Sequence, residues 1–200
     1  MFRIAVLVSG NGTNLAAIID AIKKGYLNVE ISVVIADRDC YALKRAKDNN
    51  IKTYLVDRKS SNFDEKILDI LPKNLDLIVC AGFLSILGEK IINKFKNKII
   101  NIHPALLPSF GGKGMYGAKV HKKVIEYGSK ISGCTVHFID ENIDGGPIIF
   151  QYAVPVFEDD DENSLSERIS IFEHQLIVET IRLISLNKIK INGRKVKILE

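Results

Sequence analysis

The sequence contains no tryptophan and only three cysteines, Cys40, Cys80 and Cys134. The cysteines lie far apart and form no CxxC pair, so they indicate neither a disulfide framework nor a zinc site. Cys80 and Cys134 lie within apolar runs, and we expect them to be small buried hydrophobic residues. Free thiols suit a reducing compartment, and we therefore expect a cytoplasmic protein.

Long apolar runs, basic stripes and metal-binding motifs are also lacking. The apolar stretch IAVLV near the N-terminus is far too short to cross a membrane, and no small-residue cleavage site follows it. The net charge is +4, and lysines alternate with acidic residues instead of forming a stripe interleaved with aromatics. Neither HExxH nor HxH spacing occurs. We expect no export and no membrane, nucleic-acid or metal partner.

The composition is that of an ordinary globular protein. The chain has 200 residues, of which 46% are hydrophobic and 26% are charged. This length allows one substantial hydrophobic core, and we expect residues 1–200 to form a single domain.

The first half of the chain alternates between apolar runs and segments with helical spacing. Strands are expected at residues 3–8, 30–36, 53–56, 77–80 and 99–102, and helices at residues 15–24, 42–50, 63–71 and 89–95. Strand, helix and strand in this order predict right-handed parallel crossovers. The fold class is therefore α/β, with a mostly parallel, twisted open sheet that has helices on both faces.

The second half has a different pattern. A helix is expected at residues 119–127, strands at 132–139 and 147–156, and one long helix at 164–186. Asn192 and Gly193 lie between two alternating runs, which is a strong signal for a type I′ turn. We therefore expect a C-terminal β-hairpin after the long helix.

The stretch SGNGTN lies between the first strand and the first helix. Its glycines allow a ligand to approach the backbone closely, and Gly12, Thr13 and Asn14 would offer N–H donors and a hydroxyl to an anion such as phosphate. An ordinary tight turn between strand and helix explains the same letters. The motif is neither GxGxxG nor GxxxxGK[ST], which disfavours a Rossmann cofactor.

Asn101 and His103 follow an apolar run, in the stretch IINIHPALLPSFGGKG. In open α/β sheets ligands bind beyond the carboxyl ends of the strands, and strand alternation sends residues two apart to the same side. An amide and an imidazole that converge on one point are suited to a developing oxyanion. A capped strand end with a satisfied histidine is the alternative.

Other polar residues admit more than one interpretation. In DENIDGGP, Asp144 either closes a turn or favours the imidazolium form of His103. We expect His121 to be exposed beside two lysines and His137 to make a structural bond near the site. Glu173 either serves a substrate amine or is a solvated glutamate.

The stretches SGNGTNL, AGFLSIL, NIHPALLPSF and IDGGPII occur in this order along the chain. Together they make essentially the whole chain resemble the folate-dependent formyltransferase family of purine biosynthesis. The resemblance implies the formyltransferase fold and transfer of a formyl group from 10-formyltetrahydrofolate to glycinamide ribonucleotide. We expect the protein to act as a monomer or homodimer.

The resemblance also implies roles for single residues. The catalytic set is Asn101, His103 and Asp144. The substrate is held by Gly12, Thr13, Asn14 and Glu173. Positions matching the folate site are Lys66, Leu84, Ser85, Ile86, Leu87, Asn101, Phe138, Ile139 and Asp140. The last three belong to a loop that runs from Phe138 to Asp144.

The sequence departs from the family pattern at two of these positions. Many members have an arginine at the position of Ser85, and we expect the change to alter folate affinity more than activity. Lys66 matches a second arginine, and lysine keeps the charge without the bidentate fork.

Three alternative functions remain open. Formyltetrahydrofolate deformylase usually has an extra N-terminal domain, for which there is no room when the first strand begins near residue 3. Methionyl-tRNA formyltransferase adds a C-terminal RNA-binding domain, whereas this chain is expected to end in a short hairpin. A non-enzymatic module that binds a phosphorylated metabolite would use SGNGTN and would give His103 no catalytic role.

Overall fold

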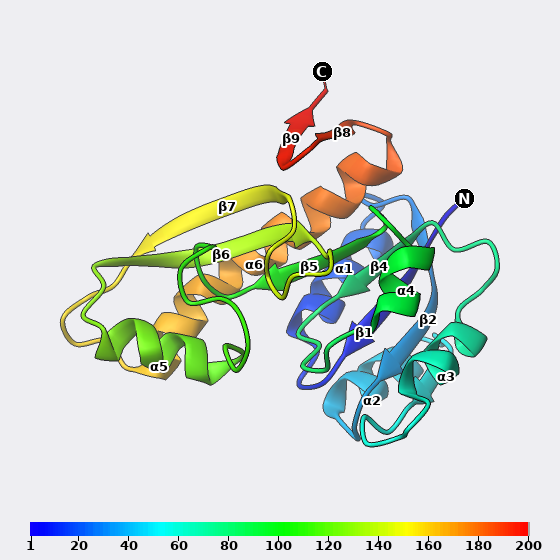
Figure 1. Ribbon diagram of the computed structural model, residues 1–200, viewed down its shortest axis with the longest axis horizontal. Helices are drawn as coiled ribbons and strands as arrows, with labels where there is room; N and C mark the ends of the chain where they lie inside the picture. The colour runs from blue at the N-terminus through cyan, green and yellow to red at the C-terminus, as the bar shows by residue number, and fades with distance from the viewer. Residues whose placement is uncertain (200) are drawn as a thin grey trace. The chain divides into compact units, whose positions relative to one another are not determined.

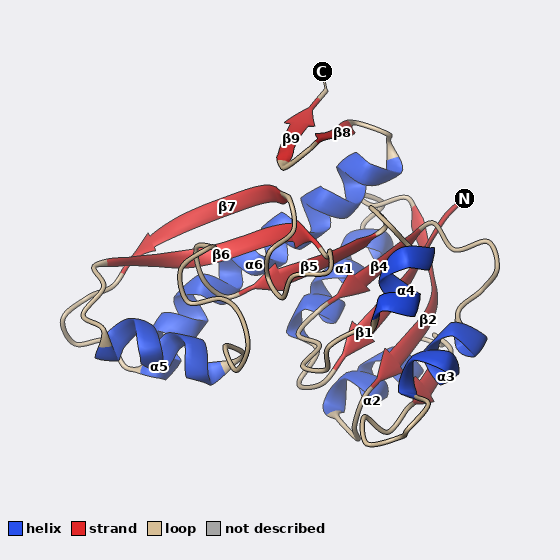
Figure 2. Ribbon diagram, in the orientation of Figure 1, coloured by secondary structure: helices blue, strands red, loops and turns tan. Residues whose placement is uncertain are grey.

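A computed structural model describes residues 1–199, in which the chain forms two compact units that divide after Asn101. The first unit alternates strands and helices, as Figures 1 and 2 show. Its elements are β1 (Phe2–Val8), α1 (Thr13–Lys23), β2 (Val29–Ala36), α2 (Tyr41–Asp48), β3 (Thr53–Leu55), α3 (Phe63–Ile70), β4 (Leu77–Cys80) and α4 (Glu89–Lys94). Strand β5 (Ile99–His103) ends this unit and continues into the second.

The strands of the first unit form a parallel sheet in the order β3-β2-β1-β4-β5. Its central strand β1 is fully buried from Ile4 to Val8, as expected of a strand covered on both faces. Figure 1 shows α1 and α2 on one face of this sheet and α3 and α4 on the other. The expected α/β class is confirmed, and the predicted elements match the observed ones to within a few residues.

The second unit contains α5 (Ala118–Glu126), β6 (Ile131–Phe138), β7 (Ile148–Pro155), α6 (Glu162–Ser185), β8 (Ile189–Asn192) and β9 (Lys195–Ile198). Strands β6 and β7 pair antiparallel, and α6 packs against both of them and against α5. The long helix and the final hairpin were both expected from the sequence. Whether the whole chain acts as one domain stays a prediction.

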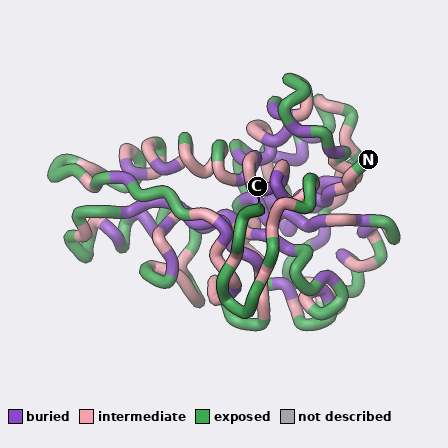
Figure 3. The backbone as a smooth tube through the Cα atoms, turned by 90° about the horizontal axis from the view of Figure 1, so that it is seen from above, coloured by how far each residue is buried: buried purple, intermediate pink, exposed green. Residues whose placement is uncertain are grey.

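Burial follows the elements closely. Strands β1, β4 and β6 are almost entirely buried, whereas most loops contain exposed residues. Figure 3 shows these buried and exposed segments along the backbone. Cys80 and Cys134 are buried and free, as predicted, and burial raises the pKa of each thiol to about 12. Within residues 1–199, no helix has the length and apolar character needed to cross a membrane. The same residues contain no group of three potential metal ligands.

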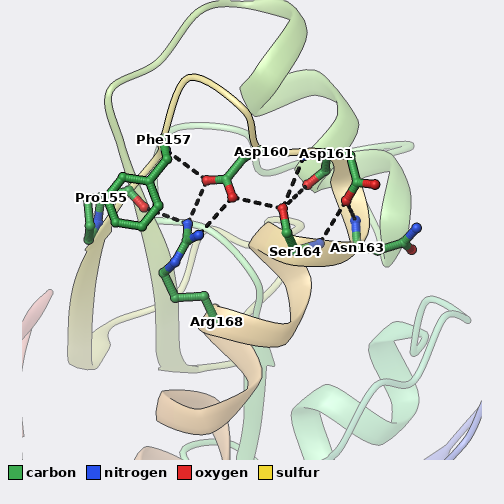
Figure 4. A network of polar contacts seen from close by, with 7 residues as sticks. All are labelled: Pro155, Phe157, Asp160, Asp161, Asn163, Ser164 and Arg168. Carbon is green, nitrogen blue, oxygen red and sulfur yellow. Dashed lines mark hydrogen bonds and ion pairs between the residues drawn. The ribbon is translucent and has the colours of Figure 1, made fainter.

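Helix α6 begins with a capping box, which Figure 4 shows in close-up. The Asp161 carboxylate accepts hydrogen bonds from the backbone N–H groups of Asn163 (2.9 Å) and Ser164 (2.8 Å). The Ser164 hydroxyl oxygen accepts in return from the Asp161 N–H at 3.1 Å. These bonds satisfy donors that a helix start would otherwise leave open.

An arginine joins the end of β7 to this helix. The Arg168 guanidinium donates two hydrogen bonds to the Asp160 carboxylate, at 2.6 and 2.7 Å, and one to the Pro155 carbonyl at 2.9 Å. It also lies 4.2 Å from the centre of the Phe157 ring. Hydrogen bonds from Arg168 hold the pKa of the Asp160 carboxyl well below its ordinary value. The network in Figure 4 therefore fixes the loop from which α6 starts.

Arg168→Met should lower the free energy of unfolding by about 2 kcal/mol, because Asp160 loses its charged partner. Since the pKa of Asp160 is depressed in the folded protein, its stabilising effect is present at neutral pH and is lost as the pH falls below about 4. Urea unfolding at several pH values measures both effects. Arg194→Met, at an exposed hairpin position, is the control. An equal loss of stability at pH 7 and pH 3 would contradict this account.

Candidate active site

The first unit presents the SGNGTN loop at the start of α1. Gly12 is the N-cap residue, with a left-handed backbone (φ +70°) and no side-chain cap. A Cβ at this position would lie 2.6 Å from the Ala42 Cβ, so that both the backbone angle and the space require glycine. Thr13 is exposed and Asn14 is buried. A helix start without a side-chain cap leaves N–H groups for a ligand, and an anion suits them best.

The segment after β4 is attached to the end of β1. The Ser9 N–H donates to the Gly82 carbonyl at 3.1 Å, and the Leu84 N–H donates to the Ser9 hydroxyl at 2.8 Å. Ile86 is 64% exposed, whereas Leu87 is buried. The structure therefore brings the segment expected to bind folate next to the strand that leads into the SGNGTN loop.

Ser85 is tied to a buried carboxylate. Its hydroxyl donates to Asp37 at 2.6 Å, and Asp37 also accepts two hydrogen bonds from the Arg38 guanidinium, at 2.9 and 2.8 Å. Burial raises the pKa of the Asp37 carboxyl, but hydrogen bonds from Arg38, Ser85 and Ser9 outweigh burial and hold it below its ordinary value. Serine at this position thus has a structural partner of its own.

Helix α3 borders the same segment. Its first turn contacts the segment twice: the Asp64 carboxylate accepts from the Gly88 N–H at 3.2 Å, and the Phe63 ring stacks on Phe83 at a centroid distance of 6.4 Å. Lys66 lies on this helix with an exposed side chain, and its ammonium donates to the Ser60 hydroxyl at 3.1 Å. Lys66 therefore lies on a helix that borders residues 82–88, with its charge open to solvent.

The histidine of the NIHP motif lies near the start of the second unit. His103 ends β5 and is 3% exposed. Its Nε2 lies 2.8 Å from the Phe110 carbonyl, and because a carbonyl can only accept, Nε2 must carry the hydrogen. Nδ1 faces Asp144 Oδ2 at 3.7 Å, which suits an ion pair with a protonated ring. Asn101, two residues earlier on β5, is half-buried.

Asp144 lies between two imidazole rings. Its Oδ2 accepts a hydrogen bond from the Gly112 N–H at 2.9 Å, and its Oδ1 lies 3.7 Å from Nε2 of His137. His137 is 1% exposed, and its Nδ1 lies 2.9 Å from the Phe138 carbonyl, which confirms the predicted structural bond near the site. Burial lowers the pKa of His137 despite the opposing charge of Asp144.

The Pro/Gly loop after β5 holds both members of the pair. Phe110 supplies a carbonyl to His103, and Gly112 supplies an N–H to Asp144. Both Phe110 and Asp144 have left-handed backbones, with φ of 52° and 53°. The sequence did not identify these backbone contacts. The dense prolines and glycines after His103 were the available signal, since they indicated a loop of defined shape.

The expected exposure of His121 was wrong. His121 is 4% exposed, because it lies with Val120 and Val124 on the buried face of α5. Burial, aided by the charge of His103, lowers the pKa of His121 to about 4. Its Nδ1 makes no hydrogen bond within residues 1–199. The exposed lysines that follow it in sequence belong to the opposite face of the helix.

The remaining expected residues of this unit are buried or half-buried. Phe138 is buried at the end of β6, and its N–H donates to the Pro147 carbonyl at 2.9 Å. Ile139 and Asp140 are half-buried, and Asp140 accepts from the Asn142 N–H at 2.8 Å. Glu173 is half-buried on α6. The structure therefore pairs His103 with Asp144, whereas no described contact joins Phe138, Ile139 or Asp140 to that pair.

Comparison with known proteins identifies the class. The formyl transferase family profile matches residues 2–181, which is most of the chain. The chain therefore belongs to the formyl transferase family.

Individual relatives are more specific. The chain is 39% identical over 197 residues to phosphoribosylglycinamide formyltransferase of Haemophilus influenzae, an alignment that covers 96% of this chain and 91% of the relative. It is similar in structure to glycinamide ribonucleotide transformylase 1 from Symbiobacterium toebii, with a TM-score of 0.93 and 40% identity over 100% of this chain and 95% of that one. A formyltetrahydrofolate deformylase from Pseudomonas syringae has the same fold at 22% identity, with a TM-score of 0.88 over 100% of this chain and 67% of the deformylase.

Several relatives are much longer than this chain. The alignment to the chloroplastic phosphoribosylglycinamide formyltransferase of Vigna unguiculata has 39% identity and covers 94% of this chain but 62% of the relative. The trifunctional purine biosynthetic proteins of Chironomus tentans and Gallus gallus are matched over 14% and 19% of their lengths.

The buried His121 should make stability depend on pH. Since the folded protein disfavours its protonated form, the unfolded chain binds the extra proton and the free energy of unfolding falls as the pH drops from about 6.5 to about 4. Wild type should lose on the order of 3 kcal/mol more than His121→Leu across this range. Urea unfolding of both proteins measures the difference, and ¹⁵N NMR of the ring measures the titration directly. A ring that titrates near pH 6.5 would contradict this prediction.

Proposed function

We propose that the chain transfers the formyl group of 10-formyltetrahydrofolate to the amine of glycinamide ribonucleotide, in purine biosynthesis. The products are formylglycinamide ribonucleotide and tetrahydrofolate. The observation that carries the proposal is the pairing of the buried His103 with Asp144. It occurs in a chain of the formyl transferase family, and relatives of the chain are named phosphoribosylglycinamide formyltransferase.

The reaction begins when the neutral amine attacks the formyl carbon. A new C–N bond forms, the carbonyl oxygen becomes an oxyanion, and breakage of the bond to folate N10 completes the transfer. The amine nitrogen loses a proton and N10 gains one. Hydrogen-bond donors aimed at the oxyanion stabilise a charge that exists only near the transition state. No covalent enzyme intermediate is needed.

His103 and Asn101 are the donors in this proposal. The Phe110 carbonyl occupies Nε2 of His103, so Nδ1 is the nitrogen that presents a proton to the oxyanion. Strand alternation places the Asn101 amide on the same side of β5. Asp144 stands 3.7 Å from Nδ1, which is too far for a short hydrogen bond, so a proton on Nδ1 would stay available to the substrate.

The two substrates would use different parts of the chain. The ribonucleotide phosphate would bind the N–H groups of Gly12, Thr13 and Asn14, where α1 lacks a side-chain cap. The Glu173 carboxylate would bind the amine of glycinamide ribonucleotide. Much of the remaining rate acceleration would come from holding the two substrates in register.

The folate would bind mainly to backbone groups of residues 84–87 and of the loop from Phe138 to Asp144. This chain has Ser85 where many family members have arginine. Because the Ser85 side chain is bonded to Asp37, the backbone groups of residues 84–87 would remain available to the folate. Lys66 would contribute a single mobile charge from α3. We further propose a cytoplasmic protein that acts as a monomer or homodimer, without a metal.

Hydrolysis of the formyl folate is the second candidate reaction, because the deformylase resemblance extends to the fold. A module that only binds a phosphorylated metabolite is the third. Such a module would not need a carboxylate beside the buried His103, which is why the pairing favours an enzyme.

His103→Ala should reduce kcat for formyl transfer to glycinamide ribonucleotide on the order of 100–1000-fold, the usual cost of losing one oxyanion donor. A steady-state assay that follows loss of the folate formyl group measures this effect. Thermal unfolding of the variant tests whether the fold survives. Activity within about threefold of wild type would reject His103 as a catalytic residue. Release of formate by wild type, with water as the only acceptor, would favour hydrolysis.

A further inference from the structure

Helix α2 holds three consecutive residues of the SGNGTN loop. The Ala42 N–H donates to the Gly10 carbonyl at 3.1 Å. The Arg45 Nε donates to the Asn11 carbonyl at 2.8 Å. Gly12 packs directly against Ala42, with no room for a side chain between them. The loop is therefore shaped by α2 as well as by the helix that it starts.

Of these three contacts, only the one from Arg45 is made by a charged side chain. Its guanidinium lies 4.8 Å from the centre of the Tyr41 ring, and its Cδ would be 3.6 Å from a Cβ on Gly12. The side chain is half-buried. With the guanidinium beside the ring and the side chain against the loop, Nε is directed at the Asn11 carbonyl.

This contact controls the direction of a backbone N–H group. In a planar trans peptide the carbonyl and the following N–H point in opposite directions. Because Arg45 holds the Asn11 carbonyl toward α2, the Gly12 N–H points away from α2. The same reasoning applies to Gly10 and the Asn11 N–H, through Ala42. Two donors next to the start of α1 are thereby aimed away from α2.

We propose that Arg45 is a positioning residue for the substrate phosphate, acting through the Asn11–Gly12 peptide. The inference rests on the proposed function, in which the phosphate binds at the start of α1. Arg45 would set the affinity for the phosphorylated substrate and leave the formyl-transfer step and the folate site unchanged.

Arg45→Gln tests the proposal, and Lys44→Gln is a matched control. Lys44 is the preceding residue on α2, and its ammonium lies 5.8 Å from the same Tyr41 ring, with no described contact to the loop. Both variants lose one positive charge, so a long-range electrostatic effect would be similar in the two. Only Arg45→Gln removes the bond to Asn11.

Arg45→Gln should raise KM for glycinamide ribonucleotide on the order of 10-fold, the usual cost of a charge-assisted hydrogen bond. The kcat at saturation and the KM for the folate should stay within about twofold of wild type. The inhibition constant of inorganic phosphate should rise by about the same factor as KM. With the dephosphorylated glycinamide riboside, Arg45→Gln and wild type should have equal kcat/KM, because the loop then has no anion to hold.

Arg45→Lys provides a second variant in case glutamine prevents folding. Lysine keeps the charge but lacks the rigid fork of arginine. The KM of Arg45→Lys for glycinamide ribonucleotide should therefore lie between those of wild type and Arg45→Gln. If only Arg45→Lys folds, its KM should still be above that of wild type. Equal KM values in the Arg45 variants and in Lys44→Gln would overturn the role of Arg45. So would an equal loss of kcat/KM for the phosphorylated and dephosphorylated substrates. Absence of turnover by wild type would instead overturn the proposed function.

Discussion

The contact between Asp144 and His103 is the one on which the candidate chemistry depends. A carboxylate 3.7 Å from a buried imidazole nitrogen has to be held there, because neither group gains from burial alone. The chain holds it with backbone atoms of one loop: Phe110 binds the ring and Gly112 binds the carboxylate. His137 closes the other side of Asp144, so that the carboxylate has a neighbour on both oxygens.

In the first unit the SGNGTN loop is likewise held in place through its backbone atoms. Helix α2 fixes the loop through main-chain carbonyls, and the residues expected to meet the phosphate contribute mostly N–H groups. In both units glycine occurs where the backbone itself makes the contact. Gly12 meets this need by conformation and by size, since a side chain would collide with Ala42. Substitutions that keep the polar side chains but move these loops should therefore be as damaging as loss of a side chain.

Much of the fold was predictable because the pattern is regular. Buried parallel strands are continuous apolar runs, such as residues 4–8, and the helices between them have an amphipathic spacing. The predicted strand at residues 77–80 matches β4 without any shift. His121 was misjudged because the neighbouring lysines indicate a solvent-facing surface. On a short helix adjacent residues point in different directions, and only packing decides which one is buried.

The sequence by itself determined the α/β class, the position of the candidate residues at strand ends, and the family to which the chain belongs. These properties depend on local periodicity and on short motifs that can be read in order. Only the tertiary structure decided that Asp144 meets His103, that Phe110 occupies Nε2 of His103 and leaves Nδ1 facing the carboxylate, and that Arg45 holds the Asn11 carbonyl. Each of these contacts joins residues separated in the chain, and distance along the sequence carries no information about which distant groups the folded backbone brings together.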